Sequence, residues 1–372
     1  MNRIYLIIAT ILLLVIAQPR VARAAEIKPA WQLDWDKTLE AAKKEGKIVA
    51  GVPASAELRK SLEENFIKRF PGIEIEVTTA RGPTNASKIA AEHAAGVRYY
   101  DVLISGSLTP LSLLNAGILD AIEPLFILPE VKDAKRWYGG HVWSDTAKRF
   151  LYSFQAYQSE NLWYNTQLMK PEEFRSFDDL LNPKWQGKIG ILDPRSAGGG
   201  TSTWAFLYKT KGEEFLKKLA GQELFLTREQ RLLGESLAKG RFAMTIGLTY
   251  YTLAPFIKAN QPIKPLPEPK EGSYTSSGSG ALSVVRNSTH PNATKVFINW
   301  LLSKEGQELY GKAMGQATRR LDVETKWLAE FGTRASKDFL SVEENQKREN
   351  SSEEVLTQLW PKAIKLANEL LK

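Results

Sequence analysis

Two adjacent tyrosines, Tyr250 and Tyr251, follow the short apolar run that ends at Ile246, and their phenols could bind a metal ion. If Thr249 caps a helix, the pair occupies the first two helical positions, where the helix dipole favours ionised phenols. A phenolate is a hard oxygen donor suited to a highly charged cation such as ferric iron, and metal binding drives its deprotonation. We predict that both are metal ligands. The alternative is that one ring packs in a core and the other lines an organic-ligand pocket.

Two further segments carry groups suited to an oxyanion. Ser105 and Ser107 follow the apolar run "DVLI"; small residues there allow close backbone approach, and the two hydroxyls can donate hydrogen bonds. An ordinary helix N-cap is the alternative for these serines. Arg81 follows the alternating run "IEIEV" and offers a fixed cation with a forked donor geometry for carboxylate or phosphate. A surface arginine is the alternative for Arg81.

The glycine-rich stretch "RSAGGGTST", residues 195–203, is a third candidate for anion binding. Successive backbone N–H groups can converge on an anion where side chains do not obstruct them. No Gly-Lys-Ser/Thr follows, so the stretch is not a phosphate loop of the ATPase kind. A flexible loop without ligand contacts is the alternative. We predict ligand contacts from Ser196, Gly198, Gly199, Gly200 and Thr201.

These candidates must be positioned by alternating strands and helices. Alternation and apolar spacing predict strands at 47–52, 73–79 and 101–107 and helices at 56–70 and 86–96. This β-α-β-α-β order predicts a mainly parallel sheet covered by helices. In such sheets ligands bind beyond the carboxyl ends of the strands, where the candidate loops lie.

The same pattern restarts after the extended segment 160–169, which indicates a second α/β lobe. Strands are predicted at 187–192 and 241–246, with two helices between them. The proline-rich segment 261–272 lacks the backbone N–H donors that a central strand needs. A strand at 280–287 is then expected to return the chain to the first lobe, and an amphipathic helix is expected near the C-terminus.

The N-terminus has the pattern of a secretory signal peptide, with Arg3, an apolar run over 4–17 and a cleavage motif ending at Ala24. The apolar run is too short for a membrane anchor. Cleavage removes three basic and no acidic residues and lowers the net charge from +8 to +5, and no basic block is dense enough for nucleic acid. The chain has no cysteine, which excludes disulfides and thiolate metal sites.

Signatures of the common enzyme classes are missing from the sequence. There is no G-x-S-x-G motif, no H-E-x-x-H motif and no cysteine nucleophile. The three histidines, His93, His141 and His290, have no recognisable catalytic partners nearby in sequence. We therefore expect a protein that is not an enzyme and has no catalytic cofactor.

Several phrases together resemble periplasmic solute-binding proteins of ATP-driven importers, in particular the branch of the ferric-iron-binding proteins. They are "WDKTLEAAKKEGKIV", "YYDVLISGS", "SFDDLLNPKWQGKIGILDPRSAGGG", the tyrosine pair and "GALSVVRNSTHPNATKVFINWLLSKEGQELY". The resemblance implies an α/β clamp of two lobes, hinge strands between them and ligand in the cleft. Lobe 1 is expected to comprise 25–155 with 275–315, and lobe 2 to comprise 156–274 with the C-terminal helices of 316–372.

The resemblance also implies a function. Tyr250 and Tyr251 look like the iron-ligating pair, so we expect a monomeric periplasmic protein that carries Fe³⁺, with or without a synergistic anion, to an ABC permease. The remaining metal ligands are not evident, since the first lobe has no obvious histidine at its cleft loops. A small organic or phosphorus oxyanion is the alternative ligand, and docking on a sensor is the alternative to import. Neither nucleic acid nor stable membrane insertion is expected.

Overall fold

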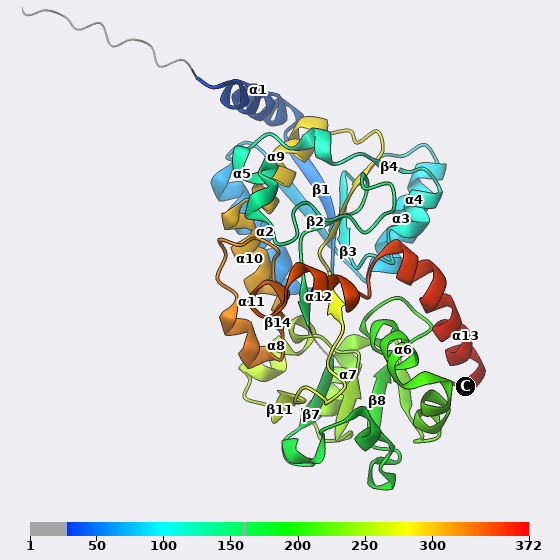
Figure 1. The fold of residues 1–372 in the computed structure, drawn as a ribbon. Helices are drawn as coiled ribbons and strands as arrows, with labels where there is room; N and C mark the ends of the chain where they lie inside the picture. Colours follow the sequence, from blue (N-terminus) through cyan, green and yellow to red (C-terminus); the bar gives the residue numbers. More distant parts are fainter. Residues whose placement is uncertain (1–27, 159–160, 372) are drawn as a thin grey trace, which may run out of the picture.

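The computed structural model describes residues 28–158 and 161–371, and Figure 1 shows two α/β halves one above the other. The blue and cyan segments make up most of the upper half, and the green segments make up most of the lower half. The predicted signal peptide, residues 1–24, lies outside the described residues. Within the described ranges, no helix combines the length and apolarity needed to cross a lipid bilayer.

The first sheet lies in the upper half. Its strands are β1 (Lys47–Val52), β2 (Glu74–Thr79), β3 (Val102–Ser105), β4 (Leu119–Asp120), β5 (Tyr152–Ser153) and β13 (Ala281–Val285). The order is β2-β1-β3-β13-β4, and β5 also pairs with β13. β1 runs parallel to β2 and β3, whereas β13 runs antiparallel to β3, β4 and β5. The chain therefore returns to this sheet after it has built the second one.

Helices cover the first sheet and bury an aromatic core against it. They are α1 (Ala30–Glu45), α2 (Ala56–Arg69), α3 (Gly82–Ala94), α9 (Pro291–Leu302) and α10 (Lys304–Met314). α1 packs on α9, and α2 packs on β2 and α10. The predicted apolar face of α2 points inward, and Phe66 meets Phe297 and Trp300 edge to face at ring-centroid distances of 5.7 and 5.4 Å.

The second sheet lies in the lower half. Its strands are β7 (Leu162–Asn165), β8 (Ile189–Leu192), β9 (Phe225–Thr227), β10 (Met244–Ile246) and β11 (Ile263–Pro265), in the order β11-β7-β10-β8-β9. β8 runs parallel to β9 and β10, and β7 runs antiparallel to β10 and β11. β11 is an edge strand, as the prolines of its segment require.

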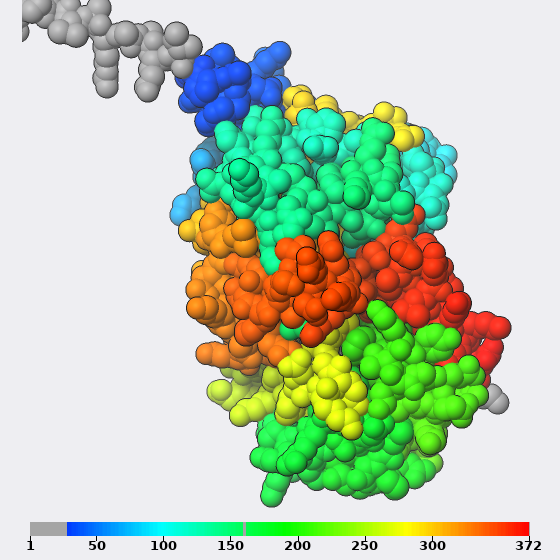
Figure 2. All heavy atoms as spheres, viewed as in Figure 1, coloured from blue at the N-terminus to red at the C-terminus, as the bar shows by residue number. Residues whose placement is uncertain are grey.

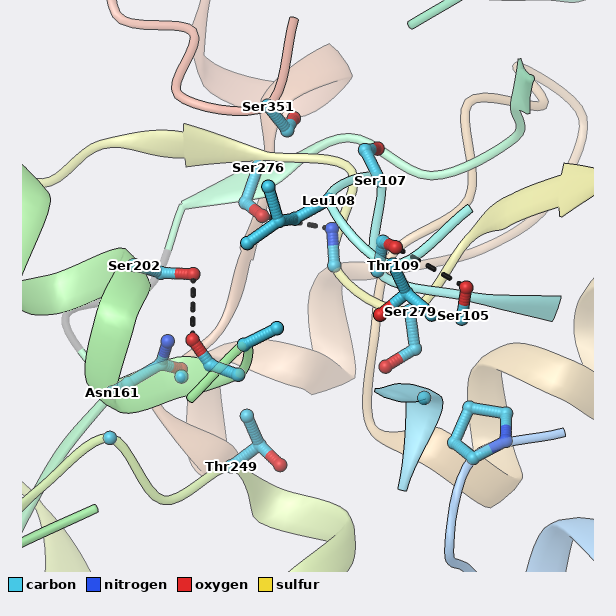
Figure 3. Close-up of a pocket in the computed structure, with 18 of the residues that line it drawn as sticks. Ser105, Ser107, Leu108, Thr109, Asn161, Ser202, Thr249, Ser276, Ser279 and Ser351 are labelled. Atoms are coloured by element: carbon cyan, nitrogen blue, oxygen red, sulfur yellow. Dashed lines mark hydrogen bonds between the residues drawn. The ribbon is translucent and has the colours of Figure 1, made fainter. Parts of the chain in front are cut away.

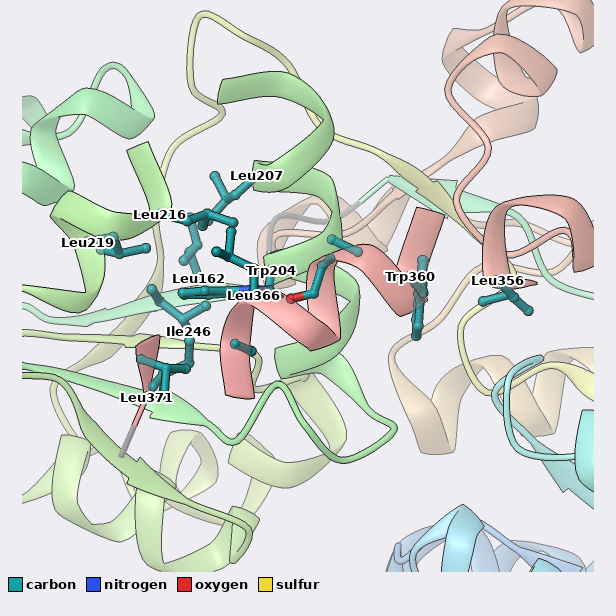
Figure 4. Packing of buried hydrophobic residues seen from close by; sticks show 14 of the residues in the cluster. Leu162, Trp204, Leu207, Leu216, Leu219, Ile246, Leu356, Trp360, Leu366 and Leu371 are labelled. Carbon is teal, nitrogen blue, oxygen red and sulfur yellow. Dashed lines mark hydrogen bonds between the residues drawn. The ribbon is translucent and has the colours of Figure 1, made fainter. Parts of the chain in front are cut away.

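Four helices pack around the second sheet: α6 (Gly199–Ala220), α7 (Gln230–Ala238), α8 (Tyr250–Lys258) and α13 (Trp360–Leu370). Figure 4 shows α13 against α6, with Leu207, Leu216 and Trp204 on one side of the contact and Leu366 on the other. The indole N–H of Trp204 donates to the carbonyl of Ala363 at 3.0 Å. The C-terminal helix is thus part of the core of the second half.

A small third sheet connects the two halves. Its strands are β6 (Tyr157–Gln158), β12 (Thr275–Ser276) and β14 (Arg334–Ala335), and β6 pairs antiparallel with the other two. Figure 2 shows that the C-terminal part of the chain, orange to red, covers the middle of this face between the two halves. The shorter α-helices are α4 (Leu111–Asn115), α5 (Pro129–Lys132), α11 (Ser336–Phe339) and α12 (Val342–Lys347).

The two main sheets are more mixed in direction than the sequence predicted. Each contains antiparallel strands, because each includes strands by which the chain crosses between the halves: β5 and β7 on the way out, β13 on the way back. Two helix bounds also differ. The helix predicted at 86–96 begins at Gly82 with Pro83 in its first turn. The C-terminal helix begins at Trp360, after a π-helical turn over Val355–Leu359.

Candidate ligand pocket between the two sheets

Loops from both main sheets line one pocket at the boundary between the halves. The lining includes loop 81–83 after β2 and loop 105–109 after β3, and, from the other half, residues 197–199 together with Gly247, Thr249 and Tyr251. These loops follow parallel strands, whose carboxyl ends form the usual ligand edge of an open sheet. The cavity volume of the pocket is about 120 Å³, which exceeds the need of a single metal ion.

Neutral polar side chains face one another across this pocket. Figure 3 shows Ser105, Thr109 and Ser279 on one side, and Ser202, Asn161 and Thr249 on the other. Arg81 is the single cationic side chain among the described lining residues, and no Asp, Glu or His is among them. The lining therefore suits a ligand with negative charge and hydrogen-bonding groups.

Three helices begin at the pocket: α3 after Arg81, α6 after Gly198 and α8 after Thr249. None of these three N-cap residues makes a side-chain hydrogen bond to its own helix. The free N–H groups of a first helical turn carry partial positive charge and attract anions. The convergence of three such ends with Arg81 gives the pocket a positive potential.

Arg81 also joins the two halves. Its Nη2 donates to the Oγ of Ser196 at 2.7 Å, so a loop of the first sheet touches a loop of the second. Ser196 borders a small side cavity shared with Arg81 and does not line the main pocket. Its carbonyl accepts a hydrogen bond from the Thr201 hydroxyl, and Thr201 is fully buried. Thr201 thus fixes the loop and does not reach the pocket.

The three glycines of the predicted anion-binding stretch do not all have the same role. Gly198 and Gly199 line the pocket, whereas Gly200 does not. A Cβ on Gly199 would lie 2.1 Å from the carbonyl oxygen of Gly247, and one on Gly200 would lie 2.0 Å from that of Leu192. Gly199 and Gly200 therefore let the first turn of α6 press against the segments that follow β10 and β8. Close backbone packing is the demonstrated role of these two glycines.

An ion-pair cluster anchors the start of the same loop. The Asp193 carboxylate accepts hydrogen bonds from Nε of Arg195 at 2.7 Å and from Nε of Arg228 at 3.1 Å. Burial alone would raise the pKa of Asp193, but the hydrogen bonds from the two arginines outweigh it and lower that pKa below its ordinary value. Asp193 thus forms ion pairs with Arg195 and Arg228, and neither arginine lines the main pocket.

Ser105 and Ser107 line the pocket but are almost fully buried. The Ser107 hydroxyl lies 2.7 Å from that of Ser277 and 3.0 Å from that of Ser144. Ser277 in turn donates to Ser351 at 3.1 Å. Ser107 is therefore the centre of a hydroxyl network that holds the wall together, while the Ser105 hydroxyl donates to the neighbouring carbonyl of Gly106.

The two adjacent tyrosines point to different surroundings. Tyr251 lines the pocket, whereas Tyr250 does not; its ring lies 4.2 Å from that of Phe331, centroid to centroid. Burial raises the pKa of Tyr250, which opposes the ionisation that metal ligation needs. The structure therefore does not bring the predicted ligand pair together in the pocket.

Several lining residues were not predicted from the sequence: Tyr157, Asn161, Tyr274, Gln316, Asn350 and Trp360. They lie in the crossing strands, their flanking turns and the C-terminal segment, which carry no motif. The Tyr274 hydroxyl accepts a hydrogen bond from Asn161. Among the described residues, no group of three or more His, Asp or Glu side chains could hold a metal ion. The phenols of Tyr157, Tyr251 and Tyr274 remain the hardest donors in the pocket.

A protein-family model, bacterial extracellular solute-binding protein, matches residues 53–308 of this chain. A curated relative from Haemophilus influenzae, an uncharacterised protein, is 31% identical over 143 residues. That match covers 37% of this chain and 40% of the relative, so less than half of the relative is compared.

Solved structures with the same fold include proteins that were solved with different ligands bound. Iron-bound HitA from Pseudomonas aeruginosa gives a TM-score of 0.65 at 18% identity, covering 88% of this chain and 99% of HitA. AfuA from Actinobacillus pleuropneumoniae, with fructose 6-phosphate bound, gives 0.65 at 21% identity, covering 87% and 99%. The ferric binding protein from Campylobacter jejuni gives 0.64 at 14% identity, covering 87% and 99%. At these identities the likeness establishes the two-lobed fold.

Proposed function

The chain belongs to the bacterial extracellular solute-binding proteins, and from this premise we propose that it captures a small phosphorylated organic anion in the pocket between its lobes. It then delivers that anion to the permease of an ABC importer. The family and the signal-peptide pattern at residues 1–24 support capture in the periplasm, and we propose that the protein acts as a monomer. Docking of the loaded protein on a sensor is the alternative use of the same clamp.

One observation carries the choice of an anion. The starts of α3, α6 and α8 meet at a pocket that contains Arg81 and, among its described lining residues, no carboxylate and no imidazole. Helix N-termini and an arginine fork together favour phosphate, whose oxygens accept several N–H bonds at once. No carboxylate among the described lining residues offsets this positive charge, which disfavours a bare ferric ion.

The lining of the pocket supports an organic phosphate over free phosphate. Beyond Arg81 and the helix ends, its walls offer serine and threonine hydroxyls, amides and aromatic rings to the rest of an ester. AfuA, which has the same fold, was solved with fructose 6-phosphate bound. A phosphorylated sugar or similar ester is thus the ligand class that we propose.

Ferric iron is the second candidate, supported by the Tyr251 phenol in the pocket and by the iron-bound state of HitA. Iron carried with a phosphate or carboxylate anion would use Arg81 for the anion and Tyr251 for the metal. Tyr250, the other predicted ligand, would need to leave its contact with Phe331. This rearrangement makes iron the less favoured ligand.

Calorimetric titration of the mature chain, residues 25–372, with inorganic phosphate and with fructose 6-phosphate tests the proposal. We expect fructose 6-phosphate to bind, and Arg81→Gln to weaken binding roughly 10- to 100-fold, since a hydrogen bond to a charged group contributes about 1.5–3 kcal/mol. Arg59→Gln, which changes an exposed arginine on α2, is the matched control and should bind like the parent.

A visible absorption titration with chelated ferric iron completes the test. A phenolate-to-iron charge-transfer band, together with no heat from either phosphate compound, would contradict the proposal and establish the second candidate. Binding of both phosphate compounds without such a band would support the organic anion. Equal affinities of the parent and of Arg81→Gln would also contradict the proposed anion site.

A further inference from the structure

Tyr157 occupies an unusual position for a buried tyrosine. It lies on β6, the central strand of the small sheet between the halves, and is only 4% exposed. One side of its ring packs against a small cluster with Ala317, Leu328 and Ala335. The same residue also lines the pocket, so Tyr157 contacts both the apolar cluster and the pocket.

The Tyr157 hydroxyl has no hydrogen-bond partner among the described residues, and it is not sealed off from the cavity. It lies against Gly278, where an added Cβ would come within 2.3 Å of it. Gly278 also lines the pocket, so the glycine leaves room for the hydroxyl at the wall. A buried hydroxyl without a protein partner is costly unless a ligand or water satisfies it.

Gln316 presents a second donor beside Tyr157. Its Oε1 accepts the backbone N–H of Ser279 at 3.1 Å, which fixes the amide and directs its Nε2 elsewhere. No described residue accepts a hydrogen bond from that Nε2, and Gln316 lines the pocket while being 3% exposed. The two residues are neighbours, because Ala156 donates its N–H to the carbonyl of Ala317 at 3.1 Å.

Both donors are uncharged at neutral pH. Burial, together with the nearby phenols of Tyr274 and Tyr251, raises the pKa of Tyr157 well above its ordinary value of 10. Its hydroxyl therefore stays protonated and can both donate and accept, as an alcohol does. The Ser279 and Ser276 hydroxyls line the same wall. The helix ends and Arg81 come from other segments of the chain than Tyr157 and Gln316.

We propose that Tyr157 and Gln316 form an uncharged subsite that hydrogen-bonds the hydroxyl-bearing part of a phosphorylated ligand and so distinguishes an ester from free phosphate. This inference rests on the proposed function, since the phosphate group must be held by Arg81 and the helix ends. Because Tyr157 lies on the strand that connects the lobes, the subsite also contacts the ligand from the hinge. It fits an oxygen-bearing, neutral body such as that of a sugar phosphate.

The test compares fructose 6-phosphate with inorganic phosphate by calorimetry on the mature chain and its variants. Tyr157→Phe keeps the ring and removes the hydroxyl. Gln316→Met keeps the approximate length of the side chain, stays uncharged and removes the amide donor. We expect each variant to bind fructose 6-phosphate about tenfold more weakly than the parent. The affinity of both variants for inorganic phosphate should stay within error of the parent, and so should the melting temperature of Tyr157→Phe without ligand.

Tyr152→Phe is the matched control, because it removes a buried hydroxyl that bonds His141 outside the pocket. It should leave both affinities unchanged. Unaltered fructose 6-phosphate affinity in Tyr157→Phe and Gln316→Met would overturn the subsite. An equal loss for both compounds would overturn it as well, since the residues would then act on the phosphate group. A parent that binds neither compound would overturn the proposed function, and this inference with it.

Discussion

Arg81 and Ser196 form a hydrogen bond although 115 positions separate them in the sequence. The bond uses one of the five guanidinium donors of Arg81, so the others are available to a ligand in the adjacent pocket. Ser196 was predicted to contact the ligand directly. In the structure its hydroxyl accepts a hydrogen bond from Arg81, which lines the pocket.

Tyr250 and Tyr251 can be separated by single substitutions. Tyr251→Phe removes a hydroxyl that lines the pocket, and we expect roughly 2- to 10-fold weaker binding of fructose 6-phosphate, the range for one hydrogen bond. Tyr250→Phe removes a hydroxyl outside the pocket and should leave the affinity unchanged. Calorimetry with the same ligand measures both. A large loss in both variants would contradict the separation of the two phenols between the pocket and the contact with Phe331.

At the scale of elements, the start of α6 depends on glycines that bring backbone against backbone. The first turn of this helix lies against the segment after β10, and its N-terminus opens onto the pocket. A helix end can act on an anion only from a short distance, because its partial charge falls off within the first turn. The packing of Gly199 and Gly200 is therefore a condition for the anion site, although Gly200 does not line it.

Gly199→Ala tests this requirement. Its new Cβ would meet the carbonyl oxygen of Gly247 at 2.1 Å, which forces the backbone to shift. We expect a loss of about 1–3 kcal/mol in the free energy of unfolding, the usual cost of overpacking, together with weaker anion binding. Thermal unfolding and calorimetry measure the two effects.

Gly106→Ala is the matched control for that substitution, because its new Cβ would make an ordinary contact of 3.4 Å with Gly278. Its melting temperature should stay close to that of the parent. If Gly199→Ala were as stable as Gly106→Ala, the close approach of α6 would not be required for the fold.

At the scale of the whole molecule, two contacts bridge the halves around the pocket. One is the bond from Arg81 to Ser196, and the other is an ion pair between Glu57 at the start of α2 and Lys258 at the end of α8. Such contacts exist only when the lobes are together. A ligand that binds the closed clamp more tightly than the open one shifts the equilibrium toward these contacts.

Lys258→Glu should therefore weaken ligand binding without loss of stability within a lobe. The substitution replaces an attraction to Glu57 by a repulsion between exposed groups, so we expect roughly 2- to 5-fold lower affinity for fructose 6-phosphate at low salt. The effect should shrink at high salt because screening weakens exposed pairs. Lys239→Glu, which alters a pair within α7 and its cap, should not change the affinity. A loss that does not depend on salt would argue against this role.

Much of the fold could be predicted because local patterns and tertiary packing agree. The strand at 47–52 has the predicted bounds, and Leu58, Leu62 and Phe66 form the buried face of α2 as their spacing indicated. The two-lobed α/β class is confirmed. The site was less predictable: Arg81, Ser105, Ser107, Gly198, Gly199 and Tyr251 line the pocket, but Tyr157 and Gln316 do so from segments with no motif. Their roles in ligand binding remain predictions.

The order of strands and helices, the family resemblance and the loops at the carboxyl ends of the strands could be predicted, because they follow from periodicity, turn residues and motifs. Which side chains line the same pocket depends on the packing of the whole chain. The direction of a side chain around a helix separates Tyr250 from Tyr251, and the crossing of the chain between the lobes brings Tyr157 beside Gln316. These arrangements depend on contacts between residues far apart in the chain, and local sequence patterns do not predict such contacts.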